Sequence, residues 1–305
     1  MSRTWRSKIH WTLTAFLWVA ATGTQTLAER SLYFTVEDGD RLIGGLREEN
    51  FRLYEDGKPV PFKLAEPETP IQVTLLVEYS QASGLYLNDI ETALLRFMEV
   101  APEGHWYSLA TFSQELQIHV DFTKLKGEIP AAYRGLGQPF WGEVNTYDAV
   151  FDTLEKLDLL GGRNALIVIG SGLNTLSAHT LGDVQKKVEA TDATVFAIGA
   201  GSLLRGMYEP YLGSVARMEL LQAEAFFNML ARKSGGQAFF PRFEAAYLDI
   251  ARSVIATLQF QYRLQYESGV RPDNKFHRLK LEAFQMTDGK RRDFKVRVRE
   301  GWRWY

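Results

Sequence analysis

Cysteine is missing from all 305 residues of the sequence. The chain therefore forms no disulfide, offers no thiolate ligand to a metal ion and has no cysteine nucleophile. Small extracellular modules are normally dense in disulfides, so an exported protein of this composition fits a bacterial envelope better than such a module.

Long hydrophobic runs are missing after residue 28. The N-terminus carries the one short run, at 11–21, between a basic start and the small residues of Thr26-Leu27-Ala28. This pattern is typical of a secretory signal peptide, here residues 1–28, and predicts an exported protein that is periplasmic or secreted. The run is shorter than the about 20 residues that span a bilayer. The alternative is an uncleaved N-terminal membrane anchor.

Catalytic motifs are also missing. The histidines are scattered without a His-Glu-x-x-His pattern, and no Gly-x-Ser-x-Gly elbow indicates a serine hydrolase. Gly199-Ala200-Gly201 follows a predicted strand, but its spacing is not that of a dinucleotide loop. We therefore expect no enzyme, with an enzyme of unknown type as a third hypothesis, and no cofactor apart from the divalent cation considered below. The four histidines that follow the signal peptide are His105, His119, His179 and His277.

Neither sign of charge is in large excess, because 35 basic residues stand against 37 acidic ones. The distribution is uneven, since residues 260–305 hold 12 Lys and Arg but only 6 Asp and Glu. Such asymmetry suits either a basic face for an acidic partner or basic strands that dock on the acidic body of the same protein. Nothing in this balance indicates a nucleic-acid partner.

Strand-like and helix-like stretches alternate between residues 71 and 259. Continuous apolar runs predict buried strands at 71–77, 106–112, 165–169 and 194–198. Only three residues separate 106–112 from the strand at 116–120, so these two should form a hairpin. Repeated βα units with one hairpin predict an α/β fold: a doubly wound, mostly parallel, Rossmann-like sheet with one antiparallel edge strand.

Two flanking regions alternate between apolar and polar residues, as half-buried strands do. Residues 29–70 should form a β-hairpin unit that turns at Glu55-Asp56-Gly57-Lys58, and residues 260–305 should add further strands. Because neither region is stable alone, we expect them to pack together as a small β unit. The predicted domains are 1–28 (signal peptide), 29–70, 71–259 and 260–305.

Residues 71–84, IQVTLLVEYSQASG, join a buried strand to a small polar loop, and the carboxyl ends of such strands are where α/β folds bind ligands. Glu78-Tyr79-Ser80-Gln81-Ala82 lies where von Willebrand factor type A (VWA) domains carry Asp-x-Ser-x-Ser, the first loop of their metal-ion-dependent adhesion site. Residues 42–62 and the ending KVRVREGWRWY are similar to the leader and closing strand of the bacterial VWFA-related family, acidobacterial type. Ser234-Gly235-Gly236-x-x-Phe239 is similar to the family's Thr-Gly-Gly-x-x-Phe. The resemblance implies a VWA domain at 71–259.

The same resemblance implies a site for a divalent cation such as Mg²⁺, held by oxygen ligands from three loops. The family pattern falls on Glu78, Ser80 and Ala82, on Thr146 in the second loop, and on Ser171 in the third. Only Ser80 and Thr146 match, and Ala82 has no ligand atom, so the site is degenerate. Glu78, Ser80 and Thr146 are the candidate metal ligands. The alternative is a polar pocket without metal, in which Glu78 and Thr146 hydrogen-bond across the crevice.

A second candidate surface is the loop 203–212, whose Arg and Tyr side chains belong to types enriched at interfaces. The leading hypothesis is an exported, non-enzymatic VWA-type module that binds another protein through the carboxyl end of the sheet. The alternative is a cation-dependent adhesion or assembly factor that uses the modified adhesion site. The predicted partner-binding residues are Glu78, Ser80, Gln81, Ser83, Thr146, Ser171, Arg205, Tyr208 and Tyr211.

Overall fold

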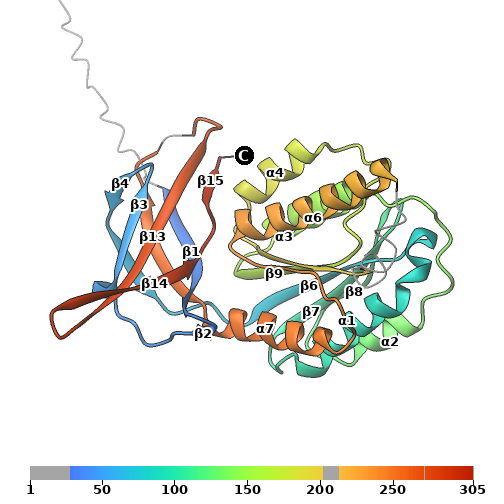
Figure 1. Ribbon diagram of the computed structural model, residues 1–305, viewed down its shortest axis with the longest axis horizontal. Helices are drawn as coiled ribbons and strands as arrows, with labels where there is room; N and C mark the ends of the chain where they lie inside the picture. Colours follow the sequence, from blue (N-terminus) through green and yellow to red (C-terminus); the bar gives the residue numbers. More distant parts are fainter. Residues whose placement is uncertain (1–27, 202–212, 271, 305) are drawn as a thin grey trace, which may run out of the picture.

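The chain forms two β-sheets that lie side by side, one antiparallel and one covered by helices (Figure 1). This computed structural model describes residues 28–201, 213–270 and 272–304. The residues before 71 and after 260 build the antiparallel sheet, and those between build the second sheet. The chain thus enters the second sheet from the first and returns to it.

The antiparallel sheet contains nine of the described strands, in the order β4-β3-β13-β14-β1-β12-β5, with β15 paired to β13 and β2 to β1. It is nearly closed (Figure 1). Strand β1 holds it together, because its first half pairs with β12 and its second half with β14. The strands are β1 (Ala28–Asp38), β2 (Arg41–Leu42), β3 (Phe51–Glu55), β4 (Lys58–Val60), β5 (Phe62–Ala65), β12 (Tyr262–Ser268), β13 (Phe276–Thr287), β14 (Lys290–Arg297) and β15 (Gly301–Arg303).

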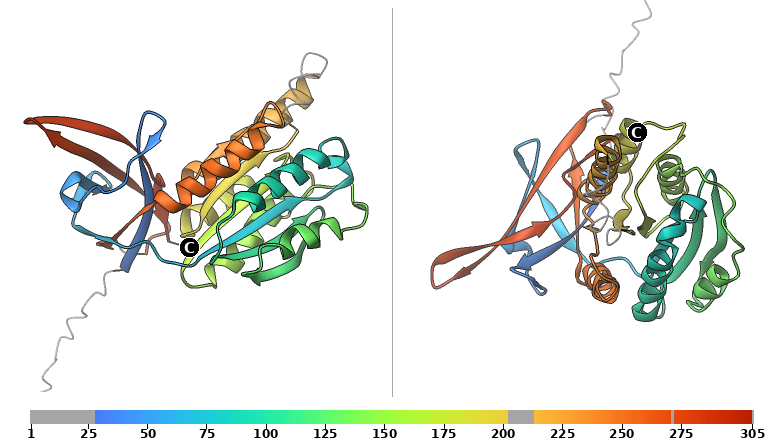
Figure 2. Two further views of the ribbon diagram at one scale, coloured as in Figure 1. Left: turned by 90° about the horizontal axis from the view of Figure 1, so that it is seen from below. Right: turned by 45° about the vertical axis from the view of Figure 1, so that its right-hand side comes forward.

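Aromatic residues fill the interior of this sheet. Phe34 and Phe51 are fully buried and pack edge to face, with ring centroids 5.3 Å apart. Trp302 of β15 is also buried, and its indole N–H donates to Glu55 Oε1 at 2.9 Å. The alternation of the sequence therefore places one face of each strand in a shared core. Outside this core, the long hairpin of β13 and β14 projects away from the body (Figure 2).

The second sheet has six described strands in the order β11-β10-β9-β6-β7-β8. Its pairings are parallel except that of β7 with β8, which is the antiparallel hairpin expected from the short link between them. The strands are β6 (Ile71–Glu78), β7 (Trp106–Phe112), β8 (Leu116–Thr123), β9 (Arg163–Gly170), β10 (Thr194–Gly199) and β11 (Ala238–Phe239).

Helices cover both faces of this six-stranded sheet, and three of the described α-helices pack on each (Figure 1). Strand residues alternate between the two resulting cores: Leu75 and Ile167 pack on one side, Leu76 and Leu166 on the other. Helices α1 (Leu87–Val100), α2 (Glu128–Arg134) and α7 (Ala246–Phe260) lie on the first side, and α3 (Thr146–Asp158), α4 (Leu181–Ala190) and α6 (Ser214–Ser234) on the second.

The predicted fold class is wrong for this chain. A doubly wound, mostly parallel, Rossmann-like sheet with a small β attachment was expected, whereas the larger sheet is antiparallel and nearly closed and the second sheet is separate and mixed. The error concerns the regions before residue 71 and after residue 260, which form a larger sheet than expected. Strands β1 and β13 run for 11 and 12 residues, and each pairs with more than one partner strand. Those partners lie far away in the sequence, so local alternation did not reveal the size of the sheet.

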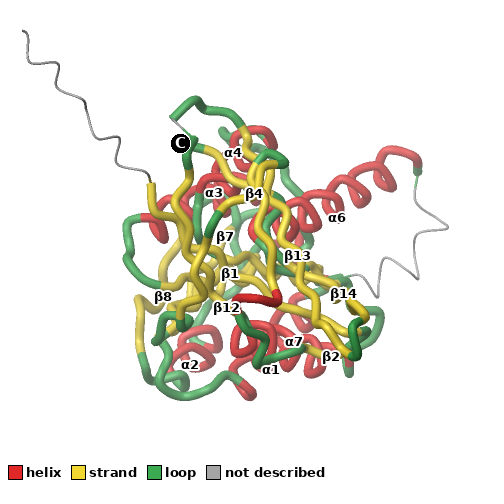
Figure 3. Tube along the Cα trace, turned by 90° about the vertical axis from the view of Figure 1, so that its left-hand side faces the viewer, coloured by secondary structure: helices red, strands yellow, loops and turns green. Residues whose placement is uncertain are grey.

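Charged residues tie the two sheets together. Arg299 is buried and donates to the backbone carbonyls of Thr191 (2.8 Å) and Glu189 (2.6 Å), which caps the C-terminal end of α4. The side chain of Glu189, also buried, pairs with Arg303 at 2.9 Å and Lys233 at 3.0 Å. Figure 3 shows the antiparallel sheet in front of the helices that these contacts join. Much of the basic charge of residues 260–305 is therefore balanced within the protein.

Within the described part of the chain, every helix is too short or too polar to cross a bilayer.

Candidate functional site

A buried carboxyl group marks the carboxyl end of the six-stranded sheet. Glu78 is the last residue of β6 and has no exposed surface. Ser171, which follows β9, donates to Glu78 Oε2 through its backbone N–H at 2.6 Å and its hydroxyl at 2.7 Å. The two neighbouring strands are thus bonded together just where they end.

The backbone leaves room for this carboxyl group only because residue 170 is glycine. A Cβ atom on Gly170 would lie 2.7 Å from Glu78 Oε2 and 2.8 Å from Glu78 Cβ. Such distances are shorter than van der Waals contact, so any side chain at position 170 would displace Glu78. The Gly170-Ser171 pair therefore provides both the space for Glu78 and its hydrogen-bond donors.

Tyr86 closes the network from the start of α1. Its hydroxyl donates to Glu78 Oε1 at 3.0 Å, and its ring lies against Gly201, where a Cβ atom would come within 3.0 Å of the ring. Burial raises the pKa of Glu78 above its ordinary value, against the opposing effect of the hydrogen bonds from Ser171, Tyr86 and Ser80. Burial, together with the negative charge of Glu78, also raises the pKa of Tyr86. Burial thus shifts the titration of the Glu78 carboxyl upward, and the hydrogen bonds of the network oppose this shift.

The nearby hydroxyl groups already have partners. Ser80 and Ser83 form a reciprocal cap in which each side chain accepts the other's backbone N–H, at 3.2 and 3.0 Å. Thr146 is buried and its hydroxyl donates to the carbonyl of Leu173. These bonds shape the loops that follow β6 and β9.

This donor set does not fit a divalent cation as arranged. The Glu78 carboxyl is bonded to Ser171 and Tyr86, the hydroxyl of Ser80 is bonded to Ser83 in its own loop, and the hydroxyl of Thr146 is bonded to Leu173 in the loop after β9. Mg²⁺ requires several oxygen ligands that point to one centre in near-octahedral geometry. Among the described residues, no group of three or more His, Cys, Asp or Glu side chains could hold a metal ion.

Above the buried network lies an exposed apolar surface. The backbone N–H of Gln81 donates to the carbonyl of Trp141 at 2.7 Å, which joins the loop after β6 to the loop before α3. Leu85, Phe140 and Trp141 on these loops are 85%, 74% and 44% exposed, and the rings of Phe140 and Trp141 pack edge to face 5.0 Å apart. We call Gln81, Leu85, Phe140 and Trp141 the loop surface.

The predicted site residues separate into buried and exposed groups. Gln81 is exposed and Ser171 is half-buried. Arg205, Tyr208 and Tyr211 lie outside the described residues. The remaining predicted residues, Glu78, Ser80, Ser83 and Thr146, are all buried.

Sequence reasoning missed Leu85, Phe140 and Trp141. A signal for the two aromatic residues exists, because Pro139-Phe140-Trp141 stands in a glycine-rich stretch between Gly135 and Gly142 with no helical or strand period. Large aromatic side chains in such a loop have no core to enter. Leu85 carries no comparable signal.

Comparisons with known proteins reveal only loose likenesses. No family model and no curated protein matches the chain. Among solved structures, an aerotolerance-related membrane protein from Bacteroides fragilis is 12% identical, with 62% of this chain and 99% of that one covered and a TM-score of 0.49. BatB from Bacteroides thetaiotaomicron is 12% identical, with 62% and 100% covered and a TM-score of 0.46.

A third similar structure is proximal thread matrix protein 1 from the mussel byssus, which is 14% identical. The alignment covers 63% of this chain and 49% of that one, with a TM-score of 0.43. Another structure of that mussel protein has a zinc-occupied metal-ion-dependent adhesion site. All of these TM-scores are below 0.5.

Proposed function

We propose that this chain is a non-enzymatic protein-binding module that recognises another protein through the loop surface. The supporting observation is the exposure of Leu85, Phe140 and Trp141 on two loops joined by the Gln81–Trp141 backbone bond. Trp and other aromatic residues are enriched among the anchors of protein interfaces, and exposed apolar clusters on soluble proteins often mark interaction sites.

In this proposal the buried network supports the surface without touching the partner. Glu78 bonds the end of β6 to Ser171, and Tyr86 fixes the start of α1 to the same carboxyl group. A rigid pair of loops loses less conformational entropy on binding than a mobile pair, which increases affinity. Glu78, Ser80, Ser83, Thr146 and Ser171 are therefore positioning residues.

The proposal includes two features that rest on the sequence. The N-terminal pattern of residues 1–28 supports export to the periplasm or beyond, where the partner would be met. The motifs around Glu78 and Ser234 support a relationship to bacterial VWFA-related proteins with a degenerate adhesion site.

Site-specific photocrosslinking tests this function. A benzophenone amino acid at Phe140, in cells of the native source, should give an adduct of discrete mass that identifies the partner. The same probe at exposed Lys290, on the far hairpin, should give none. With the purified partner, Phe140→Ser with Trp141→Ser should weaken binding by about 30-fold, as expected for loss of an aromatic hot spot.

The matched control is Ile118→Ser, which removes another exposed apolar side chain, 56% exposed on the edge strand β8. It should leave the affinity for the partner unchanged. Equal adducts from positions 140 and 290, or full affinity in the Phe140 and Trp141 double variant, would contradict the proposed function.

A further inference from the structure

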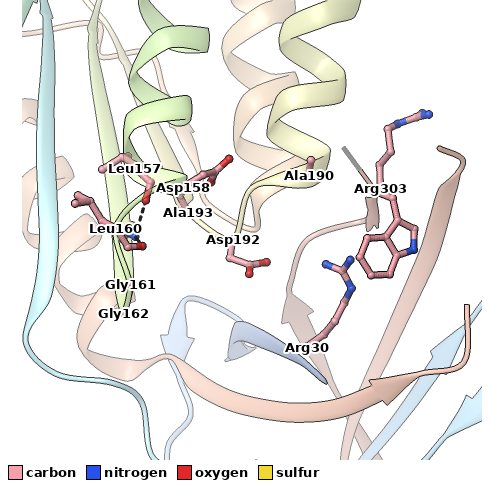
Figure 4. Close-up of a pocket in the computed structure, with 12 residues that line it drawn as sticks. Arg30, Leu157, Asp158, Leu160, Gly161, Gly162, Ala190, Asp192, Ala193 and Arg303 are labelled. Atoms are coloured by element: carbon pink, nitrogen blue, oxygen red, sulfur yellow. Dashed lines mark hydrogen bonds between the residues drawn. The ribbon is translucent and has the colours of Figure 1, made fainter. Parts of the chain in front are cut away.

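A cavity of about 520 Å³ opens between the two sheets (Figure 4). Its wall combines the segments that precede β9 and β10 with β1 and the end of the chain. It therefore lies at the opposite end of the six-stranded sheet from the loop surface. A volume in this range suits a small-molecule ligand. The side chains used below are Arg30, Asn164, Asp192 and Trp304.

Arg30 is the unusual group in this wall. Its guanidinium stacks 3.5 Å from the centre of the Trp302 ring and 4.8 Å from that of Trp304, and Figure 4 shows it reaching into the cavity. Within the described chain, it forms no ion pair within 4.0 Å, and its buried Nε atom has no hydrogen-bond partner. Stacking occupies the faces of the guanidinium and leaves its N–H edge free to donate.

Other cations at the junction do have partners. Arg299 donates to Thr191 and Glu189 carbonyls, and Arg303 pairs with the Glu189 carboxylate. The structure therefore satisfies two guanidinium groups with its own carbonyls and carboxylates and leaves the third, at Arg30, facing a cavity. A buried donor without a partner costs free energy, so its retention calls for an external acceptor.

Two further polar atoms of the wall are also unsatisfied. Trp304 Nε1, a donor, and Asn164 Oδ1, an acceptor, are buried and have no hydrogen-bond partner among the described residues. Three residues of the cavity wall, Arg30, Asn164 and Trp304, thus carry a buried polar atom that has no partner among the described residues. Asp192 lies close enough to influence Arg30 electrostatically, which disfavours ligands with several negative charges.

We infer that this junction cavity binds a singly charged carboxylate that also carries a hydrogen-bond donor, as the C-terminal end of a short peptide does. The planar guanidinium of Arg30 receives the carboxylate in the two-point geometry that suits this pair. An amide N–H of the ligand donates to Asn164 Oδ1, and a ligand oxygen accepts from Trp304. This site is independent of the loop surface and of the function proposed for it.

Isothermal titration calorimetry of the full chain with N-acetyl-triglycine tests the inference, with the C-terminal amide of the same peptide as the uncharged comparison. The acid should bind with a Kd of about 1 mM or tighter, and the amide at least about tenfold more weakly because it lacks the charge-assisted bonds. Arg30→Met should weaken binding of the acid by about tenfold or more, and Arg30→Lys by less, because Lys keeps the charge but loses the fork.

Asp192→Asn provides a change in the opposite direction, since removal of its negative charge should strengthen binding of the acid. The matched control is Arg252→Met, an exposed arginine of α7 paired with Asp249, which should bind like the unaltered chain. Equal binding of acid and amide, unchanged affinity in Arg30→Met, or no saturable binding of the acid at about 10 mM would each overturn the inference. Binding of inorganic phosphate without binding of the acid would overturn the assignment to a carboxylate.

Discussion

The two ends of the six-stranded sheet differ in their buried polar groups. Buried residues of opposite charge pair with one another where β9 and β10 begin, whereas a single carboxyl group is surrounded by hydroxyl groups where β6 and β9 end. At the first end, Arg299 and Glu189 bond to groups of both sheets. At the second, Glu78 accepts hydrogen bonds from Ser171 and Tyr86, and apolar side chains lie exposed on the nearby loops. Charge pairs thus fix one end of the sheet to the rest of the molecule, while the other end carries the exposed apolar side chains of the loop surface.

The largest loss of stability is expected where β9 and β10 begin, at the buried Arg299. Arg299→Ala should lower the free energy of unfolding by about 3 to 5 kcal/mol, because it leaves the buried carbonyls of Thr191 and Glu189 without a donor. Chemical denaturation of the full chain measures this change. Arg252→Ala, which removes an exposed arginine that is 63% accessible, should cost less than about 0.5 kcal/mol. Equal costs for the two variants would show that the junction charges do not hold the sheets together.

A smaller effect, on the pH dependence of stability, is expected from Glu78 at the end of β6. Burial raises the folded-state pKa of Glu78, so the folded chain keeps this proton at pH values where the unfolded chain has lost it. Its contribution to stability is complete below the ordinary pKa of 4.5 and is lost as pH rises through the folded-state pKa. Glu78→Gln keeps the shape without the ionisation, so its stability relative to the unaltered chain should rise with pH above about 4.5.

Urea unfolding of both proteins across this pH range measures the difference. The matched control is Glu99→Gln, whose side chain is 53% exposed, and it should follow the unaltered chain. A stability difference between the unaltered chain and Glu78→Gln that does not change with pH would mean that Glu78 titrates alike in folded and unfolded chains.

Divalent cations are expected to have the smallest effect on thermal stability. Millimolar Mg²⁺, Mn²⁺ or Ca²⁺, added after chelation, should shift the thermal midpoint by less than about 1 °C, since the Glu78 carboxyl is turned to Ser171 and Tyr86. A cation present at 100 times its Kd would add about 2.7 kcal/mol of stability and be plainly visible. A rise in midpoint that Glu78→Ala abolishes would restore the adhesion-site hypothesis and remove the contrast between the two ends.

Local pattern predicted the elements better than their assembly. The apolar runs at 165–169 and 194–198 lie within β9 and β10, and the short link at 113–115 forms the β7–β8 hairpin. The nine-stranded sheet was not predicted, because the pairing of Thr35 with Arg297 joins residues with no local relation in sequence. Register of this kind is set by the assembled core rather than by any one strand.

The sequence predicted where the residues of the candidate site lie but not how accessible they are. Motif comparison located Glu78 and Ser171, and the structure brings these two side chains together. It did not reveal that Glu78 is fully buried, since burial depends on Gly170 and Tyr86, which approach from separate elements. The absence of an ion pair between Arg30 and the described residues was equally invisible in the sequence, because the side chains around Arg30 come from regions far apart in the chain.

The residues of the six-stranded sheet lie, in the sequence, between the two parts of the nine-stranded sheet. This order determines when each sheet can be completed during synthesis. Strands β1 to β5 leave the ribosome before the six-stranded sheet, but the partners β12 and β14 of strand β1 follow only after some 190 intervening residues, 71–260, have been made. Until then β1 exposes unpaired backbone groups and an apolar face, features that invite aggregation in incomplete chains. Strands β12 to β15 therefore complete the nine-stranded sheet only after the residues of the six-stranded sheet have been made. Truncation after residue 260 would thus remove β12 to β15 from the sheet that contains β1.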